Sequence, residues 1–171
     1  VQKAVELGVY EIIPVRTARC VVRLDEAKSS KKKERWQRIA EGAAKQSGRG
    51  IVPEVFSVMN MDDAIAHAAS SDIILIPYEL CEDHQTIEEL RLSVGRGSAS
   101  IAVFIGPEGG FETGEVDAVA NAGGRVISLG HRILRTETAA IAVLANLMFM
   151  IEEAASKTVN GNEQKADNTG V

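Results

Sequence analysis

The sequence predicts an α/β protein with a mainly parallel sheet and helices on both faces. Apolar runs typical of buried strands alternate with segments of helical periodicity along most of its 171 residues. This alternation favours parallel strands, because a crossover between parallel strands leaves room for a helix and a hairpin does not. Two glycine-rich segments, 105–111 and 128–139, each follow a strand-like run and precede a helical pattern.

Helices are expected where apolar residues recur at every third or fourth position. The clearest case is an amphipathic segment in which Trp36, Ile39 and Ala43 share one face. Gly8 is expected to close the first helix, because glycine adopts the left-handed conformation of a C-terminal cap. Thr113 is the expected N-cap of the fifth. In order, the expected helices are Lys3–Leu7, Lys33–Gln46, Asp62–Ala69, Glu82–Leu92, Gly114–Ala122 and Thr136–Ala155.

Strands are expected where short apolar runs are bounded by glycine, proline or polar residues. The run Ile73–Ile76 has no polar interruption, which is typical of a strand that is buried on both faces. In order, the expected strands are Tyr10–Val15, Arg19–Leu24, Pro53–Val58, Asp72–Tyr78, Ile101–Ile105 and Val126–Leu129.

Length and composition favour one globular domain over residues 1–156. Residues 157–171 are polar and rich in Gly and Asn, so they are expected to form a disordered tail. The chain starts at Val1 rather than Met, so it is expected to be a piece of a longer polypeptide.

The chain is expected to be cytoplasmic and to have no membrane partner. Its longest apolar stretch, Ala139–Ile151, contains Asn146 and is too short to cross a bilayer. Cys20 and Cys81 stand far apart without CxxC spacing, which fits a reducing compartment rather than a disulfide framework or zinc site.

Basic residues are concentrated in one part of this acidic chain. The formal net charge is −5, yet residues 28–49 hold eight basic and two acidic residues, so this segment carries +6 and the rest of the chain −11. Such asymmetry is typical of a local contact with a polyanion such as RNA, although a solvated helix face would have the same composition. The candidate contacts are Lys31, Lys32, Arg38, Gln46 and Arg49.

Common nucleotide and metal motifs are missing from the sequence. It contains no GxxxxGK[ST] phosphate loop, and Gly95–Gly97 lacks the third glycine of a dinucleotide motif and precedes a strand instead of following one. His67, His84 and His131 show no metal-ligand spacing, so no metal site is expected.

The two glycine-rich segments predict a pocket that is built largely from backbone groups. Taken singly, the first fits a strand-to-helix turn, and the second fits an N-terminal cap with Thr136 as N-cap and Glu137 complementing the helix dipole. Capping leaves Arg135 unexplained, because a cation near a helix N-terminus is unfavourable unless it faces an anion. Arg135 is therefore the strongest single candidate for function.

These motifs resemble those of a known family. The segments IGPEGGF (105–111) and SLGHRILRTETA (128–139) are similar to the two signature loops of the RsmE family, SPOUT-class ribosomal RNA (uracil-N3) methyltransferases. Residues 3–9 (KAVELGV) resemble the family's K-x-x-ELGV stretch. Arg35-Trp36, the AAKQS of residues 43–47 and Arg49 resemble its basic helix. The resemblance covers about residues 3–152.

The resemblance implies a SPOUT fold with a trefoil knot in the C-terminal half, where the two loops pass one another. It further implies S-adenosyl-L-methionine bound inside the knot and a homodimer that pairs there. The family also has an N-terminal, PUA-like RNA-binding domain that this chain is expected to lack, which puts rRNA affinity in doubt but not cofactor binding.

The resemblance also implies the residues around the cofactor, in which main chain holds the adenine and apolar side chains enclose it. These residues are Leu75, Ile76, Pro77, Gly106, Pro107, Glu108, Gly109, Gly110, Ser128, Leu129, Gly130, Ile133 and Leu134.

The reaction that this family implies assigns candidate roles to three charged residues. Uracil N3 must lose its proton to become a good nucleophile, and a positive charge beside the uracil carbonyl oxygens stabilises the resulting anion. Arg135 is the candidate for that role or for holding a nearby RNA phosphate. Glu108 and Glu137 are both candidates for taking the proton, or for orienting Arg135 or the cofactor.

Two other functions stay open. Another SPOUT reaction, on a ribose 2′-oxygen or a tRNA base, would share the knot but not the acceptor. A non-catalytic RNA-binding or dimerisation module would account for the basic segment without a need for the cofactor.

Overall fold

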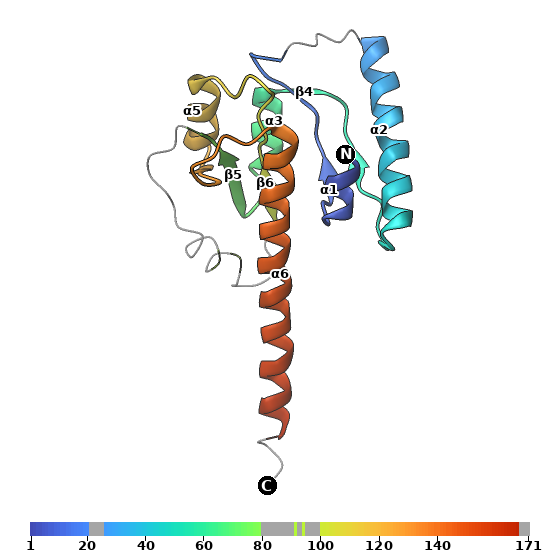
Figure 1. Cartoon of the computed structure of the whole chain (residues 1–171), viewed down its shortest axis with the longest axis vertical. Helices are drawn as coiled ribbons and strands as arrows, with labels where there is room; N and C mark the ends of the chain where they lie inside the picture. The colour runs from blue at the N-terminus through green and yellow to red at the C-terminus, as the bar shows by residue number, and fades with distance from the viewer. Residues whose placement is uncertain (21–25, 80–90, 92–93, 95–99, 168–171) are drawn as a thin grey trace.

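The computed structural model describes residues 1–20, 26–79, 91, 94 and 100–167 (Figure 1). Helices and strands alternate along the chain, and each strand pair in these residues is parallel. The predicted α/β class with parallel strands is confirmed.

The N-terminal part contains two small sheets, in which β1 pairs with β3 and β2 pairs with β4. Pro14 separates β1 from β2 and has no N–H to give to a ladder, so the predicted strand over residues 10–15 is divided. The elements are α1 (Gln2–Glu6), β1 (Glu11–Ile12), β2 (Val15–Arg16), α2 (Glu26–Gln46), β3 (Glu54–Val55) and β4 (Met59–Asn60).

The rest of the chain forms a three-stranded parallel sheet with the strand order β6-β5-β7. The chain leaves β5 for β6 on one side and then crosses through α5 to β7 on the other side, so β5 is the point where the order reverses. The elements are α3 (Met61–Ala68), β5 (Ile73–Pro77), β6 (Ile101–Val103), α5 (Thr113–Asn121), β7 (Arg125–Ile127) and α6 (Thr136–Asp167).

Helices cover both faces of this sheet, as predicted. Ile74 and Ile76 of β5 pack in one core cluster with apolar residues of α3 and α5. Ile73 and Leu75 pack in a second cluster with apolar residues of α6. Alternate side chains of the same strand therefore enter two cores, which explains why the strand reads as a continuous apolar run.

A third core cluster belongs to the N-terminal part. Val5 of α1, Ala40 and Ala44 of α2 and Val55 of β3 are wholly buried there. Trp36 packs against this cluster from α2, which agrees with its place on the apolar face of the predicted helix.

The structure differs from the prediction in the extent of several elements. Within the described residues, the strands form three separate parallel sheets instead of a single one, and most of these strands are only two or three residues long. The helix predicted over Lys33–Gln46 begins earlier, at Glu26. Residues 21–24 of the predicted strand Arg19–Leu24, most of the predicted helix Glu82–Leu92, and the loop 95–97 lie outside the described residues.

Helix α5 is capped one residue earlier than predicted. Glu112, rather than Thr113, is its N-cap. The Glu115 carboxylate accepts a hydrogen bond from the Glu112 N–H at 2.9 Å, because an acidic residue at the third helical position can reach back to the cap.

Helix α6 is the longest helix in the described residues. It continues to Asp167, into the segment 157–171 for which the sequence predicts disorder, and the predicted domain end at residue 156 stays a prediction. Its Thr136–Ser156 part has a mean hydropathy of 1.5 and, by length and composition alone, is long enough to cross a membrane, although the stretch Ala139–Ile151 is not. One face, which includes Val143, is buried against the sheet, whereas Ile141 and Phe149 are 40% and 64% exposed.

Candidate active site

The two glycine-rich loops meet at the carboxyl end of the three-stranded sheet. The loop after β6 and the loop after β7 flank the end of β5, because β6 and β7 pair with opposite edges of that strand. In open parallel sheets this point of reversal is where ligands bind. The fold therefore brings together two segments that are separate in sequence.

Two adjoining cavities occupy this end of the sheet. The larger has a volume of about 560 Å³ and lies between the Gly106–Phe111 loop and the start of α6. The smaller has a volume of about 440 Å³ and is lined mainly by residues 128–134. The two cavities form one crevice, because five residues line both of them. These residues are Pro77, Glu79, Ile133, Leu134 and Ala139.

The Gly106–Phe111 loop is a tight turn that needs its glycines. The Gly110 N–H donates to the Pro107 carbonyl at 2.9 Å. Gly110 has a φ of +69°, which a residue with a side chain rarely adopts. A Cβ on Gly110 would also lie 3.3 Å from a carboxylate oxygen of Glu79. Backbone and carboxylate therefore approach each other closely at the edge of the crevice.

The second loop is turned by Gly130, which has a φ of +102°. The Gly130 N–H donates to the Ser128 hydroxyl at 3.2 Å. Beyond this turn Ile133 is 87% exposed, although it is apolar and lines both cavities. An exposed aliphatic side chain over a crevice is the kind of surface that a flat, apolar ligand covers.

The three predicted catalytic residues line the larger cavity. Arg135, Glu108 and Glu137 all contribute to its wall, and all three are exposed. Helix α6 begins at Thr136, and the Arg135 carbonyl accepts the N–H of Ala139 at 2.8 Å. Arg135 therefore takes the N-cap position in place of Thr136, which puts a cation at the positive end of the helix dipole.

Most of the predicted cofactor residues line the crevice. Leu75 and Ile76 do not, because both are wholly buried inside β5 and face opposite cores. They support the strand whose last residue, Pro77, reaches the crevice. The predicted residues that do line it are Pro77, Gly106, Pro107, Glu108, Gly109, Gly110, Ser128, Leu129, Gly130, Ile133 and Leu134.

Glu79 lines both cavities and was not predicted as a site residue. The signal that points to it is its place just after β5, because the residues that follow parallel strands gather at the same edge of a sheet. It adds a carboxylate where the two cavities join.

The predicted RNA contacts of the basic segment lie on or just after α2, at the edge of the molecule opposite α5 (Figure 1). No residue of α2 lines either cavity of the crevice. Lys31, Arg38 and Gln46 are exposed. The Lys32 ammonium lies 5.7 Å from the Trp36 ring centre. Arg38 also pairs with Glu34 at 3.6 Å, a contact between exposed side chains that costs little to break.

Arg49, the last of these predicted contacts, is already engaged with backbone. Its guanidinium donates to the carbonyls of Val5, Gly8 and Val9 at 3.0, 3.1 and 2.7 Å. These carbonyls lie at the end of α1 and in the turn that follows it, and that of Val5 also accepts the N–H of Gly8 at 3.1 Å. Arg49 therefore ties α2 to α1, and its contact with RNA stays a prediction.

Another cavity, of about 430 Å³, lies between the N-terminal strands and β6. Apolar residues such as Ile13, Val15 and Phe104 line most of it. Its wall also includes His67, whose Nε2 lies 2.7 Å from a Glu11 carboxylate oxygen. It adjoins the crevice, because five residues line both this cavity and the larger one: Ile105, Gly106, Pro107, Phe111 and Thr136. None of the three catalytic candidates lines it.

Comparison with known proteins defines the class. The family described as RNA methyltransferase domain matches residues 1–148, and the chain belongs to this family.

Individual relatives agree. A Bacillus subtilis protein named ribosomal RNA small subunit methyltransferase E is 38% identical over 155 residues, which are 89% of this chain and 60% of the relative. The structure of a Neisseria gonorrhoeae protein of the same name, bound to S-adenosyl methionine, has a TM-score of 0.69 at 35% identity, over 87% of this chain and 58% of that one. A Legionella pneumophila structure with bound cofactor SAM has a TM-score of 0.75 at 36% identity, over 85% of this chain and 57% of that one.

These comparisons confirm the resemblance to the RsmE family. The chain spans about 60% of the length of the curated relatives that it matches.

Proposed function

We propose that this chain is the catalytic part of an S-adenosyl-L-methionine-dependent methyltransferase that methylates N3 of a uridine in small-subunit ribosomal RNA. The observation that carries the proposal is the crevice in which both glycine-rich loops meet beside Arg135. The names of the relatives support the rRNA substrate, and the SAM-bound structures among them support the cofactor.

The residues of the crevice fit S-adenosylmethionine. The cavity volumes lie in the range of small-molecule sites, about 300–1,000 Å³. Ile133, Leu134 and Pro77 offer apolar surface for an adenine ring, and Gly106, Gly109 and Gly110 bring backbone to the wall of the crevice. Glu79 offers a negative charge to a molecule with an ammonium group and a sulfonium.

S-adenosylmethionine, when bound, supplies an electrophilic methyl group. Arg135 has the position to stabilise the nucleophile, because it lines the crevice at the N-terminus of α6. The charge of its guanidinium and the positive end of the helix dipole add there. A uracil that has lost its N3 proton spreads negative charge over both carbonyl oxygens. The positive charge of Arg135 would then lie beside these oxygens and stabilise the anion.

The proton from N3 needs an acceptor. Glu108 and Glu137 both line the cavity with Arg135, and either carboxylate is chemically able to take it. The N3 lone pair then forms the new N–C bond as the C–S bond breaks, which leaves a neutral thioether and the methylated base. Close positioning of the two reactants supplies much of the rate in such a displacement.

Helix α2 is proposed as the grip on the RNA backbone. Lys31, Lys32 and Arg38 present positive charge along a helix that lines neither cavity of the crevice, so a strand can be held while one base is splayed out to reach Arg135. Gln46 and Arg49 would extend this contact at the end of the helix.

We also propose the SPOUT knot and a homodimer at the knot region, in the cytoplasm where ribosomal subunits are. The meeting of both loops at one crevice supports the knot. The exposed Ile141 and Phe149 support the dimer, because a second copy would cover an apolar helix face that this chain leaves open.

The test is transfer of a labelled methyl group from S-adenosylmethionine to small ribosomal subunits from a strain that lacks the modification, with a protein that contains this chain within its full length. The expected result is label in rRNA, and 3-methyluridine after nuclease digestion and mass spectrometry. A 2′-O-methyl nucleoside or a labelled tRNA base would mean another SPOUT reaction. Absence of both label and cofactor binding would mean a non-catalytic RNA-binding or dimerisation module.

A further inference from the structure

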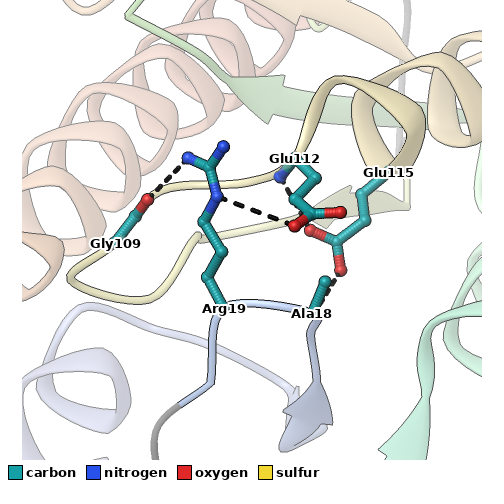
Figure 2. A network of polar contacts seen from close by, with 5 residues as sticks. All are labelled: Ala18, Arg19, Gly109, Glu112 and Glu115. Atoms are coloured by element: carbon teal, nitrogen blue, oxygen red, sulfur yellow. Dashed lines mark hydrogen bonds and ion pairs between the residues drawn. The ribbon is translucent and has the colours of Figure 1, made fainter.

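Arg19 connects the N-terminal part of the molecule to the Gly106–Phe111 loop (Figure 2). Its Nη1 donates to the Gly109 carbonyl at 2.9 Å, and its Nε lies 3.9 Å from a carboxylate oxygen of Glu112. Gly109 and Glu112 stand on either side of the end of this loop. One guanidinium therefore holds both, from a residue 90 positions earlier in the sequence.

A second link runs beside the first. The Ala18 N–H donates to one oxygen of the Glu115 carboxylate at 2.8 Å, while the other oxygen accepts the N–H of Glu112 at 2.9 Å (Figure 2). The Glu115 carboxylate, which belongs to the capping box of α5, is thus also bound to Ala18, the residue beside Arg19. Loop and helix start are fixed from the same segment.

The backbones approach closely at this point. A Cβ on Gly109 would lie 3.3 Å from the Cβ of Arg19, which is tighter than most contacts of this kind. Gly109 therefore packs directly on Arg19, against the Cβ and Cδ atoms of its side chain.

Contacts that hold the Gly106–Phe111 loop offset the entropy cost of ordering it. Glycine-rich backbone loses more conformational freedom on ordering than other backbone does. Within the described residues, the loop makes one backbone hydrogen bond to itself, from the Gly110 N–H to the Pro107 carbonyl. A loop ordered before binding saves that entropy when a ligand arrives.

We propose that Arg19 is a positioning residue, which holds the Gly106–Phe111 loop in the conformation that receives S-adenosylmethionine. The proposal rests on the proposed function and extends it, because Arg19 lines neither of the two cavities of the crevice and acts through Gly109. The competing role is direct contact with RNA phosphate, since the Arg19 side chain is 50% exposed.

The test uses Arg19→Ala and Arg19→Lys, with Arg16→Ala as the matched control. Arg16 is exposed on β2, and its side chain makes no hydrogen bond or ion pair within the part of the chain that the structure describes. Calorimetry measures the Kd of S-adenosylmethionine. Hydrogen exchange of the peptide that contains residues 106–115 measures loop order without any ligand. The thermal midpoint and the affinity for an rRNA fragment are measured on the same samples.

Arg19→Ala is expected to weaken cofactor binding about three- to tenfold, a modest loss for a charged hydrogen bond because the pair is half exposed. Exchange should rise in the loop peptide and stay unchanged in peptides from β5. Arg19→Lys keeps a donor and should restore most of the affinity, and Arg16→Ala should match wild type. If Arg19→Ala does not fold, Arg19→Gln takes its place.

Unchanged cofactor affinity and loop exchange in Arg19→Ala would overturn the proposal, as would lost RNA affinity with cofactor binding intact. Faster exchange throughout the protein with a lowered thermal midpoint would overturn it too, because the role would then be general stability. Failure of the wild-type chain to bind S-adenosylmethionine would instead overturn the proposed function, so the two failures are distinguishable.

Discussion

Among single residues, Arg135 is a candidate for function because its charge is unfavourable where it stands. Capping and the helix dipole account for Glu137, but they disfavour a cation at the start of α6. The structure puts Arg135 at the N-cap and on the wall of the larger cavity. The sequence could indicate this residue because the electrostatic conflict is local and needs no tertiary information.

Arg135→Ala is expected to lower the rate of methyl transfer on the order of 100-fold, the usual cost of removing one stabilising group at a developing anion. The Kd of S-adenosylmethionine should change far less, because the charge that Arg135 meets forms on the uracil. Single-turnover rates and calorimetry measure the two effects, with Arg135→Lys as the charge-retaining control. Equal losses in both would place Arg135 in the cofactor site.

The partner of the Arg49 guanidinium could not be predicted from the sequence. Its position after a basic helix predicts a phosphate contact, yet its guanidinium is bound to three carbonyls at the end of α1. Those carbonyls lie about 40 residues earlier, and no local pattern reports that they meet the guanidinium.

Arg49→Ala is therefore expected to lower the free energy of unfolding by about 1–3 kcal/mol, since several backbone acceptors lose a charged donor. Urea unfolding measures this, with Arg38→Ala as control because the pair of Arg38 with Glu34 is fully on the surface. A loss no larger than that of Arg38→Ala would show that the carbonyls find water at no cost.

At the scale of elements, the starts of β5 and β6 are joined by one side-chain pair. The Ser100 N–H and hydroxyl each donate to the Asp72 carboxylate at 2.8 Å. These hydrogen bonds, the backbone one first, lower the pKa of Asp72 below its usual value. The carboxylate form is thus favoured in the folded state.

The sign of the pH dependence follows. Since the folded pKa is depressed, Asp72 contributes stability above its unfolded pKa of about 3.9, and this contribution is lost as the pH falls through the lower folded value. The urea midpoint of Asp72→Asn should therefore fall less between about pH 5 and pH 3 than that of wild type. An equal fall of the urea midpoint in both proteins over this pH range would contradict the assigned role of Asp72.

Helix α2 carries the prediction about RNA. Replacing Lys31 and Arg38 by Ala should weaken rRNA binding at low salt and reduce the slope of log K against log salt by about one for each phosphate that is no longer neutralised. The Kd of S-adenosylmethionine should not change, because no residue of α2 lines either cavity of the crevice. Filter binding over a salt series measures the slope, and an unchanged slope would mean that α2 is only a solvated face.

The extent of the elements shows the limit of sequence patterns. An apolar face that recurs along a helix locates the helix to within a few residues, as in α3 and α5. Strand lengths are overestimated because an apolar run does not show where pairing stops. Pro14 divides one predicted strand, but where pairing stops is known only once the partner strands β3 and β4 are known.

For the whole molecule, the sequence predicted the parallel α/β architecture and the meeting of two loops, because both follow from strand order and from family motifs. It did not predict the division into three sheets or the length of α6. The division into sheets depends on contacts between segments far apart in sequence, which no local pattern reports. The C-terminal half of α6 projects away from the rest of the molecule (Figure 1), so no packing explains its length.

Phe149→Asp is expected to convert the proposed homodimer to a monomer, because a buried carboxylate at the centre of an apolar contact would be unpaired. Light scattering after size-exclusion chromatography measures the mass. Asp117→Asn, an exposed change on α5, serves as control. A wild-type chain that is monomeric at every concentration tested would contradict the dimer.

An NMR titration of the isotope-labelled chain with S-adenosylmethionine tests the proposed cofactor site. We expect the amide signals of Gly109, Gly110 and Gly130 to shift together and saturate at one molecule per chain. Shifts confined to residues of the apolar cavity beside β6, such as Val15 and Phe104, or no shifts at all, would contradict it.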